Sequence, residues 1–309
     1  MNADLQSINY KPSKFLRFWR KVIWTFKIYL KPRHIATVDT VNGLLSFDSK
    51  DKKTGRNLYV YRSFEYDMML EAIEFLRSIG AIKQPKGQGT VLDVGGYIGM
   101  SSTGFMLSHL FAKSIAFEPN PNSFKLLQRN VAQNNLDNRV TAHNVALSDK
   151  PGELEFELSH DNYGDNRVRS SVDTTSNGFN EADRKTIKVK ANSLDNLIAN
   201  QAIADVDDIV LVWMDVQGHE GFFMKGATEF LKAHKHIPIV MEFWPYAMNR
   251  SGMKKESFIN MAESLFTAFY SLDDEDSIKH PVSELLAFYE RLESSSNPSA
   301  GASVILLND

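Results

Sequence analysis

Short apolar runs alternate with segments of helical spacing along most of the chain. A continuous apolar run of a few residues is typical of a buried strand, whereas apolar positions three and four residues apart indicate a helix. Runs of the first kind lie at Val91–Val94, Ser114–Phe117, Val140–Leu147, Ile209–Met214, Ile237–Phe243 and Ser303–Leu307. Helical spacing occurs between them, at Ile98–Phe111, Pro121–Asn135, Glu220–Ala233 and Glu256–Thr267. The alternation predicts an α/β fold with a doubly wound, mostly parallel sheet and helices on both of its faces.

An insertion interrupts this alternation after the third predicted strand. Leu154–Leu158 and Thr186–Ala191 alternate apolar and polar residues with a period of two, which predicts an inserted pair of strands. The segment between them, Ser159–Lys185, is polar and long for a connection in a compact domain. Long loops of this kind are usually functional, so we expect a lid or a binding loop.

The residues before the sheet are predicted to form two further parts. Ile35–Arg62 has the pattern of short strands, with turns at Val41-Asn42-Gly43 and Lys53-Thr54-Gly55. Glu65–Ile79 has helical spacing. Its apolar face consists of Met69, Ala72, Ile73 and Leu76.

Lys14–Leu30 has the pattern of a basic amphipathic helix with Ser13 as its N-cap. The apolar face holds Phe15, Phe18, Trp19, Val22, Ile23, Phe26, Tyr29 and Leu30. The opposite face is basic, except that Trp24 and Ile28 interrupt it. A basic helix rich in aromatic residues suits an anionic membrane interface, here through residues 13–31. The other interpretation is that the apolar face packs on the protein's own core and leaves Lys and Arg outside.

Composition excludes several classes of protein. Of the 309 residues, 43% are hydrophobic and 24% are charged, as in an ordinary globular chain. The absence of cysteine excludes disulfides, Cys-ligated metal sites and a Cys nucleophile, and it fits a reducing cytosol. The sequence contains neither an apolar run long enough for a transmembrane helix nor a secretory signal. We therefore expect a cytoplasmic protein, peripheral at the inner face of the membrane if the basic helix binds lipid.

Charge is unevenly distributed along the chain. The net charge is −3, yet Lys11–Arg33 holds eight Lys and Arg and no acidic residue. The remainder carries 27 basic against 38 acidic residues, so nucleic acid is not an expected partner. We predict a helical extension over residues 1–34 and one α/β domain over residues 35–309. Within that domain, residues 86–309 form the sheet and residues 35–85 precede it.

The first strand of the predicted sheet leads into the sequence Asp93-Val94-Gly95-Gly96-Tyr97-Ile98-Gly99. Glycine lets the backbone turn tightly and approach a ligand closely. The spacing of Gly95, Gly96 and Gly99 does not fit the G-x-G-x-x-G fingerprint, which argues against an NAD(P)-dependent oxidoreductase. Open α/β sheets bind ligands beyond the carboxyl ends of their strands, so we expect this loop to border a site.

The second strand ends in Phe117-Glu118-Pro119-Asn120. A carboxylate at this place can accept hydrogen bonds from both hydroxyls of a ribose. Glu118 follows Asp93 by 25 residues, close to the spacing of consecutive strands in one βαβ unit. The alternative is that Glu118 only caps the next helix. The two motifs together favour ribose binding.

These motifs resemble those of the FkbM-type methyltransferases, within the class I S-adenosylmethionine-dependent methyltransferases. The resemblance is carried by Val91–Gly99, Phe117–Pro119 with Asn130, Ala146–Asp149, Ser193–Asp195 and Met214–Glu220. It implies a Rossmann-like methyltransferase fold and S-adenosyl-L-methionine as cofactor. Carried onto this chain, it places the cofactor against Asp93, Gly95, Gly96, Tyr97, Gly99, Glu118, Pro119, Asn120, Ala146 and Leu147.

The activity that the resemblance implies is transfer of a methyl group to a hydroxyl of a sugar, a glycolipid or another small molecule. The reaction needs an aligned acceptor oxygen and a group that takes its proton. Asp215 and His219, after the fourth strand, are the candidate bases, and Glu242 adds a carboxylate at the end of the fifth. Asp215 and Glu242 are also candidate ligands of a divalent metal that would acidify the hydroxyl.

One position departs from the family pattern. Gln217 stands where the D-x-E-G-x-E pattern usually has its second acid, while Asp215, Gly218 and Glu220 are retained. A metal or base role of the missing carboxylate is therefore open. A non-catalytic protein that binds the cofactor, a membrane or a partner is the alternative function.

Aromatic and polar residues near the strand ends suit a sugar acceptor. Trp213, Trp244 and Tyr246 offer flat faces to a sugar ring, although Trp213 is equally suited to the core. The inserted loop offers hydrogen bonds from Asn162, Tyr163, Asp165, Asn166 and Arg167.

Overall fold

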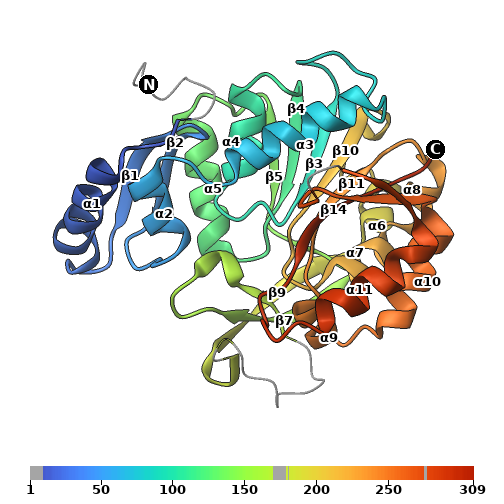
Figure 1. The fold of residues 1–309 in the computed structure, drawn as a ribbon. Helices are drawn as coiled ribbons and strands as arrows, with labels where there is room; N and C mark the ends of the chain where they lie inside the picture. The colour runs from blue at the N-terminus through green and yellow to red at the C-terminus, as the bar shows by residue number, and fades with distance from the viewer. Residues whose placement is uncertain (1–9, 170–178, 180, 275–276) are drawn as a thin grey trace.

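The computed structural model of the chain describes residues 10–169, 179, 181–274 and 277–309. An eight-stranded sheet forms its centre, in the order β13-β12-β14-β11-β10-β3-β4-β5 (Figure 1). These strands are β3 (Thr90–Val94), β4 (Lys113–Phe117), β5 (Val140–His143), β10 (Ile209–Met214), β11 (Ile239–Phe243), β12 (Ala268–Ser271), β13 (Lys279–Pro281) and β14 (Ala302–Leu307). Neighbours from β5 to β11 are parallel, whereas β14 is antiparallel to β11 and β12. The predicted doubly wound α/β fold is confirmed, with a mixed edge beyond β11.

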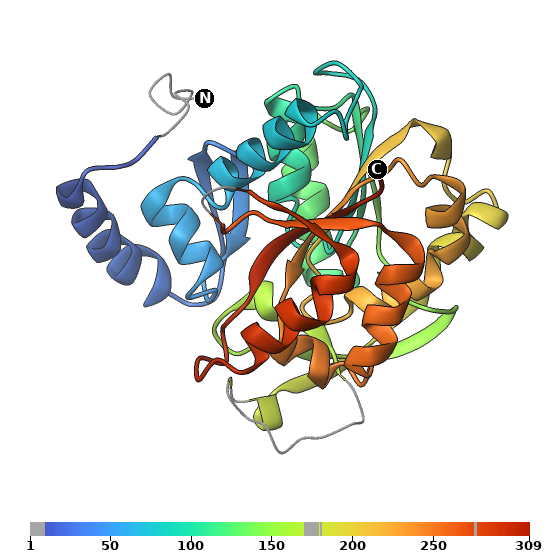
Figure 2. The same cartoon turned by 45° about the vertical axis from the view of Figure 1, so that its right-hand side comes forward.

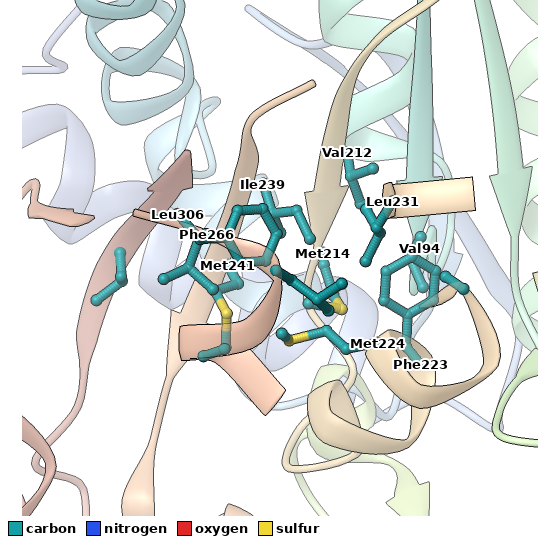
Figure 3. Packing of buried hydrophobic residues seen from close by; sticks show 14 of the residues in the cluster. Val94, Val212, Met214, Phe223, Met224, Leu231, Ile239, Met241, Phe266 and Leu306 are labelled. Atoms are coloured by element: carbon teal, nitrogen blue, oxygen red, sulfur yellow. The ribbon is translucent and has the colours of Figure 1, made fainter. Parts of the chain in front are cut away.

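Helices cover both faces of the sheet. Successive strand residues point to opposite sides, and the apolar residues on each side are buried under helices. Leu92 and Val94 belong to a buried cluster with residues of α7, α8, α10 and α11, part of which Figure 3 shows. Val91, the residue before Leu92, belongs to a second cluster with α3, α4 and α5 on the other face. The helices are α3 (Tyr66–Ser78), α4 (Met100–Leu107), α5 (Pro121–Gln133), α6 (Leu194–Ala199), α7 (Glu220–Gly226), α8 (Thr228–Ala233), α9 (Pro245–Arg250), α10 (Lys255–Leu265) and α11 (Leu285–Glu293).

The helical pattern over Glu220–Ala233 predicts one helix, but the structure has two, α7 and α8. The carboxylate of Asp195, from α6, accepts hydrogen bonds from the backbone N–H groups of Glu229 and Phe230 at 3.0 and 2.9 Å. It therefore caps α8 as a separate helix. The sequence pattern also missed β12, β13, α6, α9 and α11, because short elements contain few periodic positions.

A second sheet, in the order β6-β9-β7-β8, borders the carboxyl ends of the central strands. Its strands are β6 (Ala146–Leu147), β7 (Gly152–Leu158), β8 (Arg167–Val168) and β9 (Lys185–Asn192). The antiparallel pair β7 and β9 confirms the predicted insertion. Residues 170–178 and 180 of the predicted lid lie outside the described residues.

The prediction of one strand over Val140–Leu147 is wrong, because β5 ends at His143 and β6 joins the second sheet. The side-chain amide of Asn144 donates to the carbonyl groups of Glu118 and Pro119 at 2.8 and 3.0 Å. These hydrogen bonds take the place of strand pairing and lead the chain out of the central sheet.

β1 (Ile35–Thr40) and β2 (Gly43–Asp48) form an antiparallel hairpin beside the central sheet. The prediction of strands after this hairpin is wrong, because α2 (Thr54–Tyr61) is a helix. The carboxylate of Asp51 accepts hydrogen bonds from the N–H groups of Lys53 and Gly55 at 3.1 and 2.9 Å. This starts a helix where the sequence pattern indicated a turn. The helix predicted next is confirmed as α3, with Met69, Ala72, Ile73 and Leu76 buried.

The N-terminal helix lies at the left edge of the molecule in Figure 2. α1 (Lys14–Ile23), with Ser13 as N-cap, continues into the wider π-helical segment η2 (Trp24–Tyr29). Trp24 and Ile28, which interrupt the basic face, pack on the hairpin, whereas most large side chains of the predicted apolar face are exposed. The interpretation in which that apolar face packs on the core is therefore wrong. None of the helices in the described part of the chain is both long and apolar enough to cross a bilayer.

Asn130 joins the hairpin to the glycine loop after β3. It is fully buried in α5, and its side chain accepts a hydrogen bond from the N–H of Ser46 and donates one to the carbonyl of Ser46, at 2.7 and 3.1 Å. It also donates to the carbonyl of Ile98 at 2.7 Å. One side chain thus satisfies three backbone groups from segments that are far apart in the sequence.

Asn130→Ala is expected to lower the free energy of unfolding by about 3 kcal/mol, because three backbone groups lose their partner. Chemical denaturation followed by circular dichroism measures this change. Gln128→Ala, at an exposed position of the same helix, is the matched control and should stay within about 0.5 kcal/mol of the wild type. Equal stability of the two variants would contradict the role of Asn130.

Candidate active site

A cavity of about 700 Å³ lies at the carboxyl ends of β3, β4, β10 and β11. The chain proceeds from β3 to β4 on one side of the sheet, and from β10 to β11 on the other. Between β3 and β10 the strand order therefore reverses, and open α/β sheets bind their ligands at such a switch point. Residues of α2, of the loop before α3 and of the inserted segment form the other walls.

The glycine loop after β3 is pressed against the chain that leaves β10. Gly95 has a φ of +93°, and a Cβ atom there would lie 1.9 Å from the carbonyl oxygen of Asp215. Any residue other than glycine would force the two backbones apart. The N–H groups of Gly95 and Gly96 donate to the carbonyl of Phe117 at 3.0 and 2.9 Å, so the same loop is tied to the end of β4.

Asp93 and Glu118 are buried carboxyl groups that line the cavity. Burial raises the pKa of Asp93 to about 6, against the opposing effect of a hydrogen bond from Ser102. Burial likewise raises the pKa of Glu118 to about 8. Its two oxygens accept backbone hydrogen bonds from Tyr97 and Asn120 at 2.9 and 2.7 Å, and each oxygen keeps a further lone pair. Both carboxyl groups can therefore accept hydrogen bonds from a ligand.

Most of the predicted cofactor-binding residues line this cavity, namely Asp93, Gly95, Gly96, Tyr97, Glu118, Pro119, Ala146 and Leu147. The other two have local roles. Gly99, with a φ of +82°, is the N-cap of α4, and the side chain of Asn120 caps α5 by accepting from the N–H of Asn122 at 3.0 Å. The hydroxyl of Tyr97 donates to Asp51 at 2.9 Å and ties the glycine loop to the start of α2.

Asp215 and Glu242 come together as predicted, and Gln217 lies between them. The side-chain nitrogen of Gln217 is 2.6 Å from Oδ1 of Asp215 and 2.6 Å from Oε2 of Glu242. Gln217 holds this place with a φ of +53°, a left-handed conformation that is uncommon outside glycine. Its amide bridges the two carboxyl groups, as a cation would.

The two bridged carboxyl groups are buried together, and each affects the pKa of the other. Burial raises the pKa of Asp215, and burial together with the charge of Asp215 raises the pKa of Glu242 well above its ordinary value. Two like charges so close together favour a state in which one of them is protonated. The pair as a whole therefore retains a proton at a higher pH than an isolated carboxyl group in water would.

Glu65 is a cavity residue that the sequence reasoning missed. It precedes α3 with a φ of +52° and lines the cavity. The surrounding protein and the charge of Asp215 raise its pKa. An acidic residue at the start of a helix is common because it interacts favourably with the helix dipole. The sequence around Glu65 therefore did not indicate that this residue lines a cavity.

His219 lines the cavity as a neutral ring. Its Nε2 is 2.9 Å from the hydroxyl of Ser148, and the ring stacks on Phe222. Burial lowers the pKa of His219 to about 4, which makes it a weak base at neutral pH. Its Nδ1 is buried without a hydrogen-bond partner among the described residues. The neighbouring Glu220 accepts from the N–H of Gly218 at 3.1 Å at the start of α7, which favours a helix-start role.

A buried ion network supports the inserted segment. Arg184 pairs with Asp165 and, at 3.2 Å, with Glu157, while Arg167 pairs with Glu157 and Glu181 at 3.0 Å each. All five side chains are almost fully buried, so removal of one partner would leave an uncompensated charge. Arg167, predicted to bind an acceptor, thus belongs to the scaffold. The other predicted loop residues line the cavity, namely Asn162, Tyr163, Asp165 and Asn166.

One wall of the cavity is aromatic. Trp244 and Phe179 line it with their ring centroids 5.3 Å apart, and Tyr246 stacks on Trp244 at 5.6 Å. Trp213 also reaches the cavity, but its ring packs in the core against Phe105 at 5.3 Å. Of the three predicted aromatic residues, Trp244 therefore contributes to this wall and Tyr246 supports it, while Phe179 is an aromatic lining residue that was not predicted.

The cavity lining is strongly acidic. Among the described residues, the acidic members of the lining are Glu65, Asp93, Glu118, Asp161, Asp165, Asp215 and Glu242, against Lys53 and Arg184 as its Lys and Arg members. Such a lining favours ligands that carry positive charge or hydroxyl groups over phosphates. Within the described ranges, no three Asp, Glu or His side chains are grouped to hold a metal ion. The metal prediction therefore rests on the two carboxyl groups of Asp215 and Glu242.

Comparison with known proteins finds a methyltransferase among the relatives of this chain. A 2-O-methyltransferase named NoeI, from Sinorhizobium fredii (strain NBRC 101917 / NGR234), is 27% identical over 161 residues, which are 49% of this chain and 63% of that protein. The chain thus spans less than two thirds of that relative's length.

Two solved structures illustrate the more distant matches. The methyltransferase FkbM from Methylobacillus flagellatus KT has a TM-score of 0.36 and 14% identity, over 79% of this chain and 55% of that one. TYW2 from Pyrococcus horikoshii, solved in complex with MeSAdo, has a TM-score of 0.34 and 14% identity, over 73% of this chain and 58% of that one.

The family model described as the methyltransferase FkbM domain matches residues 93–272. The matched range begins at the first carboxylate of the site, Asp93, and includes Glu118, Asp215 and Glu242. It covers more than half of the chain, and the chain therefore belongs to the FkbM methyltransferase family.

Proposed function

We propose that this methyltransferase uses S-adenosyl-L-methionine and methylates a hydroxyl group of a saccharide or glycolipid. The observation that carries this proposal is the presence of two carboxyl sites in one cavity. Asp93 and Glu118 lie at the carboxyl ends of β3 and β4, whereas Asp215 and Glu242 lie at those of β10 and β11. The first pair would bind the cofactor, and the second would bind the acceptor hydroxyl.

Asp93 and Glu118, at the carboxyl ends of β3 and β4, fit the cofactor. The free lone pairs of Glu118 can accept hydrogen bonds from the two ribose hydroxyls, and Asp93 can accept one from the amino group of the methionine part. S-adenosylmethionine has two positively charged groups, a sulfonium and an ammonium, and one negatively charged carboxylate. Its net charge is therefore positive, and an acidic lining attracts it. The same lining would repel the pyrophosphate of NAD(P), which weakens the oxidoreductase alternative.

Asp215 and Glu242, at the carboxyl ends of β10 and β11, suit methyl transfer to a hydroxyl group. The bound cofactor supplies a methyl group that its positive sulfur already activates. With the proton of the pair on Glu242, Asp215 would accept the hydroxyl proton of the acceptor as the acceptor oxygen bonds to the methyl carbon and the bond from that carbon to the cofactor's sulfur breaks, which releases S-adenosylhomocysteine. The protonated Glu242 donates a hydrogen bond to a neighbouring acceptor oxygen, and Gln217 holds both carboxyl groups in place. His219, with its lowered pKa, is the weaker candidate base.

The walls of the cavity favour a sugar over a phosphorylated acceptor. Trp244 and Phe179 offer an apolar surface of the kind on which a sugar ring packs, and Asn162 and Asn166 offer hydrogen bonds to its hydroxyls. The relative described as a 2-O-methyltransferase supports transfer to oxygen. Gln217 is the feature that favours a non-catalytic protein, but its amide keeps the carboxyl pair assembled.

Calorimetric titration with S-adenosylmethionine is expected to give a Kd on the order of micromolar for the full chain. Glu118→Ala and Asp93→Ala should each weaken binding by about a hundredfold or more, because hydrogen bonds to a charged group are lost. Glu155→Ala, exposed on β7, is the matched control and should bind like the wild type. Unchanged affinity in both site variants refutes the cofactor assignment. Thermal protection by NAD(P) and none by S-adenosylhomocysteine would instead support an oxidoreductase.

Cofactor affinity is expected to rise with pH. The pKa of Glu118 is about 8 in the free protein, and only the ionised carboxylate accepts hydrogen bonds from both ribose hydroxyls. Below that pH, binding must release a proton, so the affinity should rise by up to about tenfold per pH unit and level off above pH 8. Titrations at several pH values in buffers of different ionisation enthalpy measure the proton release. Glu118→Gln should remove the dependence between about pH 6 and pH 8 and leave that of Asp93 below its pKa of about 6, and a wild-type affinity independent of pH would contradict the prediction.

Asp215→Asn is expected to lower methyl transfer by about a hundredfold or more while cofactor binding persists, because the base is lost. The assay follows labelled methyl from S-adenosylmethionine into a fractionated cell extract, with identification of the labelled product. We expect a chelator to leave the wild-type rate unchanged, since the Gln217 amide bridges the carboxyl pair. Gln217→Glu, which groups three carboxyl groups, should make the rate dependent on divalent cations. A wild-type rate that a chelator abolishes would establish the metal role of Asp215 and Glu242 instead.

A further inference from the structure

We propose that α1 and η2 form a docking surface for anionic lipid bilayers, a property separate from the methyl transfer proposed above. The surface consists of exposed apolar side chains together with lysines beside them. Phe15, Phe18, Phe26 and Leu30 are 72%, 59%, 67% and 61% exposed, and Trp19 is 46% exposed. Large apolar side chains gathered on one helix face usually mark a binding surface.

The opposite face of the helix is already anchored, so the exposed face is not free to turn inward. Trp24 is 3% exposed and packs between Phe47 and Tyr59, with ring centroids 5.8 and 5.7 Å away. The guanidinium of Arg20 donates to the carbonyl of Val60 at 3.0 Å. These contacts hold α1 against α2 and the hairpin and direct the aromatic face away from the protein.

The π-helical segment extends this arrangement beyond α1. Trp24, Ile28 and Tyr29 belong to the hairpin cluster, while Phe26 and Leu30 remain exposed. α1 and η2 together contain ten and six residues, or roughly 24 Å of helix at an α-helical rise. That length is too short to span a bilayer, but it suits a helix lying in the plane of the interface.

The charges beside the aromatic face identify the partner as anionic. Lys14, Lys21 and Lys27 are exposed on the helix, and residues 11–33 include no acidic side chain. Lysine stems can lie along the apolar surface while their ammonium groups reach lipid phosphates. A second copy of the chain would instead bring the same lysines together, and lysine is depleted at protein interfaces.

Membrane docking would also bring the cavity near lipid. α2 contacts α1 through Val60 and lines the cavity with Thr54 and Asn57. One short helix thus links the docking surface to the cavity. If the proposed function holds, a lipid-linked glycan becomes the favoured class of acceptor.

The experiment is sedimentation of the full chain with vesicles of phosphatidylcholine alone or of phosphatidylcholine with phosphatidylglycerol. We expect binding to the anionic vesicles, and we expect Lys14→Glu/Lys21→Glu/Lys27→Glu to reduce the partition coefficient by at least about a hundredfold. Lys150→Glu/Lys190→Glu/Lys235→Glu, exposed elsewhere, is the charge-matched control and should bind like the wild type. Phe15→Ser/Phe18→Ser/Trp19→Ser tests the apolar contribution and should also lose binding.

Tryptophan fluorescence provides a second measurement. Of the four tryptophans, Trp19 is exposed, whereas Trp24, Trp213 and Trp244 are buried. Anionic vesicles should shift the emission to the blue, and Trp19→Phe should abolish the shift. Equal binding to neutral and anionic vesicles, or by the two lysine variants, overturns the proposal. The proposal also fails if neither the wild type nor Phe15→Ser/Phe18→Ser/Trp19→Ser binds vesicles and the wild type is a dimer that this variant makes monomeric. The exposed face would then be a contact between two copies of the chain. Vesicle binding needs no cofactor, so its failure is distinct from failure of the proposed function.

Discussion

The site depends on how closely the backbone after β3 approaches the backbone after β10. These strands are parallel neighbours at the switch point, and the N–H of Asp215 donates to the carbonyl of Val94 at 2.9 Å. A Cβ atom on Gly95 would overlap the carbonyl of Asp215. Because the two chain segments touch there, the carboxyl groups at the carboxyl ends of β3, β4, β10 and β11 line one cavity and not several separate clefts.

This convergence has an electrostatic consequence. Carboxyl groups that are brought together and removed from water repel one another, so their pKa values rise. The protein offsets part of that cost with hydrogen-bond donors. The backbone N–H groups of Tyr97 and Asn120 serve Glu118, and the amide of Gln217 serves both Asp215 and Glu242. The remaining acceptor capacity is what a cationic cofactor and a hydroxyl-bearing acceptor would use.

Parts of the cavity lie outside the range that the family model matches. α2 and Glu65 precede residue 93, yet they line the same cavity as Asp93. Asn130 holds the hairpin next to them, and the hydroxyl of Tyr97 ties the glycine loop to Asp51. The N-terminal region is therefore part of the site's construction, and through Arg20 and Trp24 it also positions the exposed helix.

Local patterns in the sequence were sufficient to predict most strands of the central sheet, most of the long helices and the glycine loop, because periodicity and glycine spacing depend on neighbouring residues. They also indicated that Asp93, Glu118, Asp215 and Glu242 would lie at the carboxyl ends of sheet strands, and all four line the cavity. Contacts between distant segments decided the rest. Asn144 ended β5, Asp51 began α2, and Asp195 separated α8 from α7. Which face of the N-terminal helix is buried depended on where Trp24 meets Phe47 and Tyr59. Periodicity shows that a helix has two unlike faces, but only the position of the rest of the chain determines which face is covered.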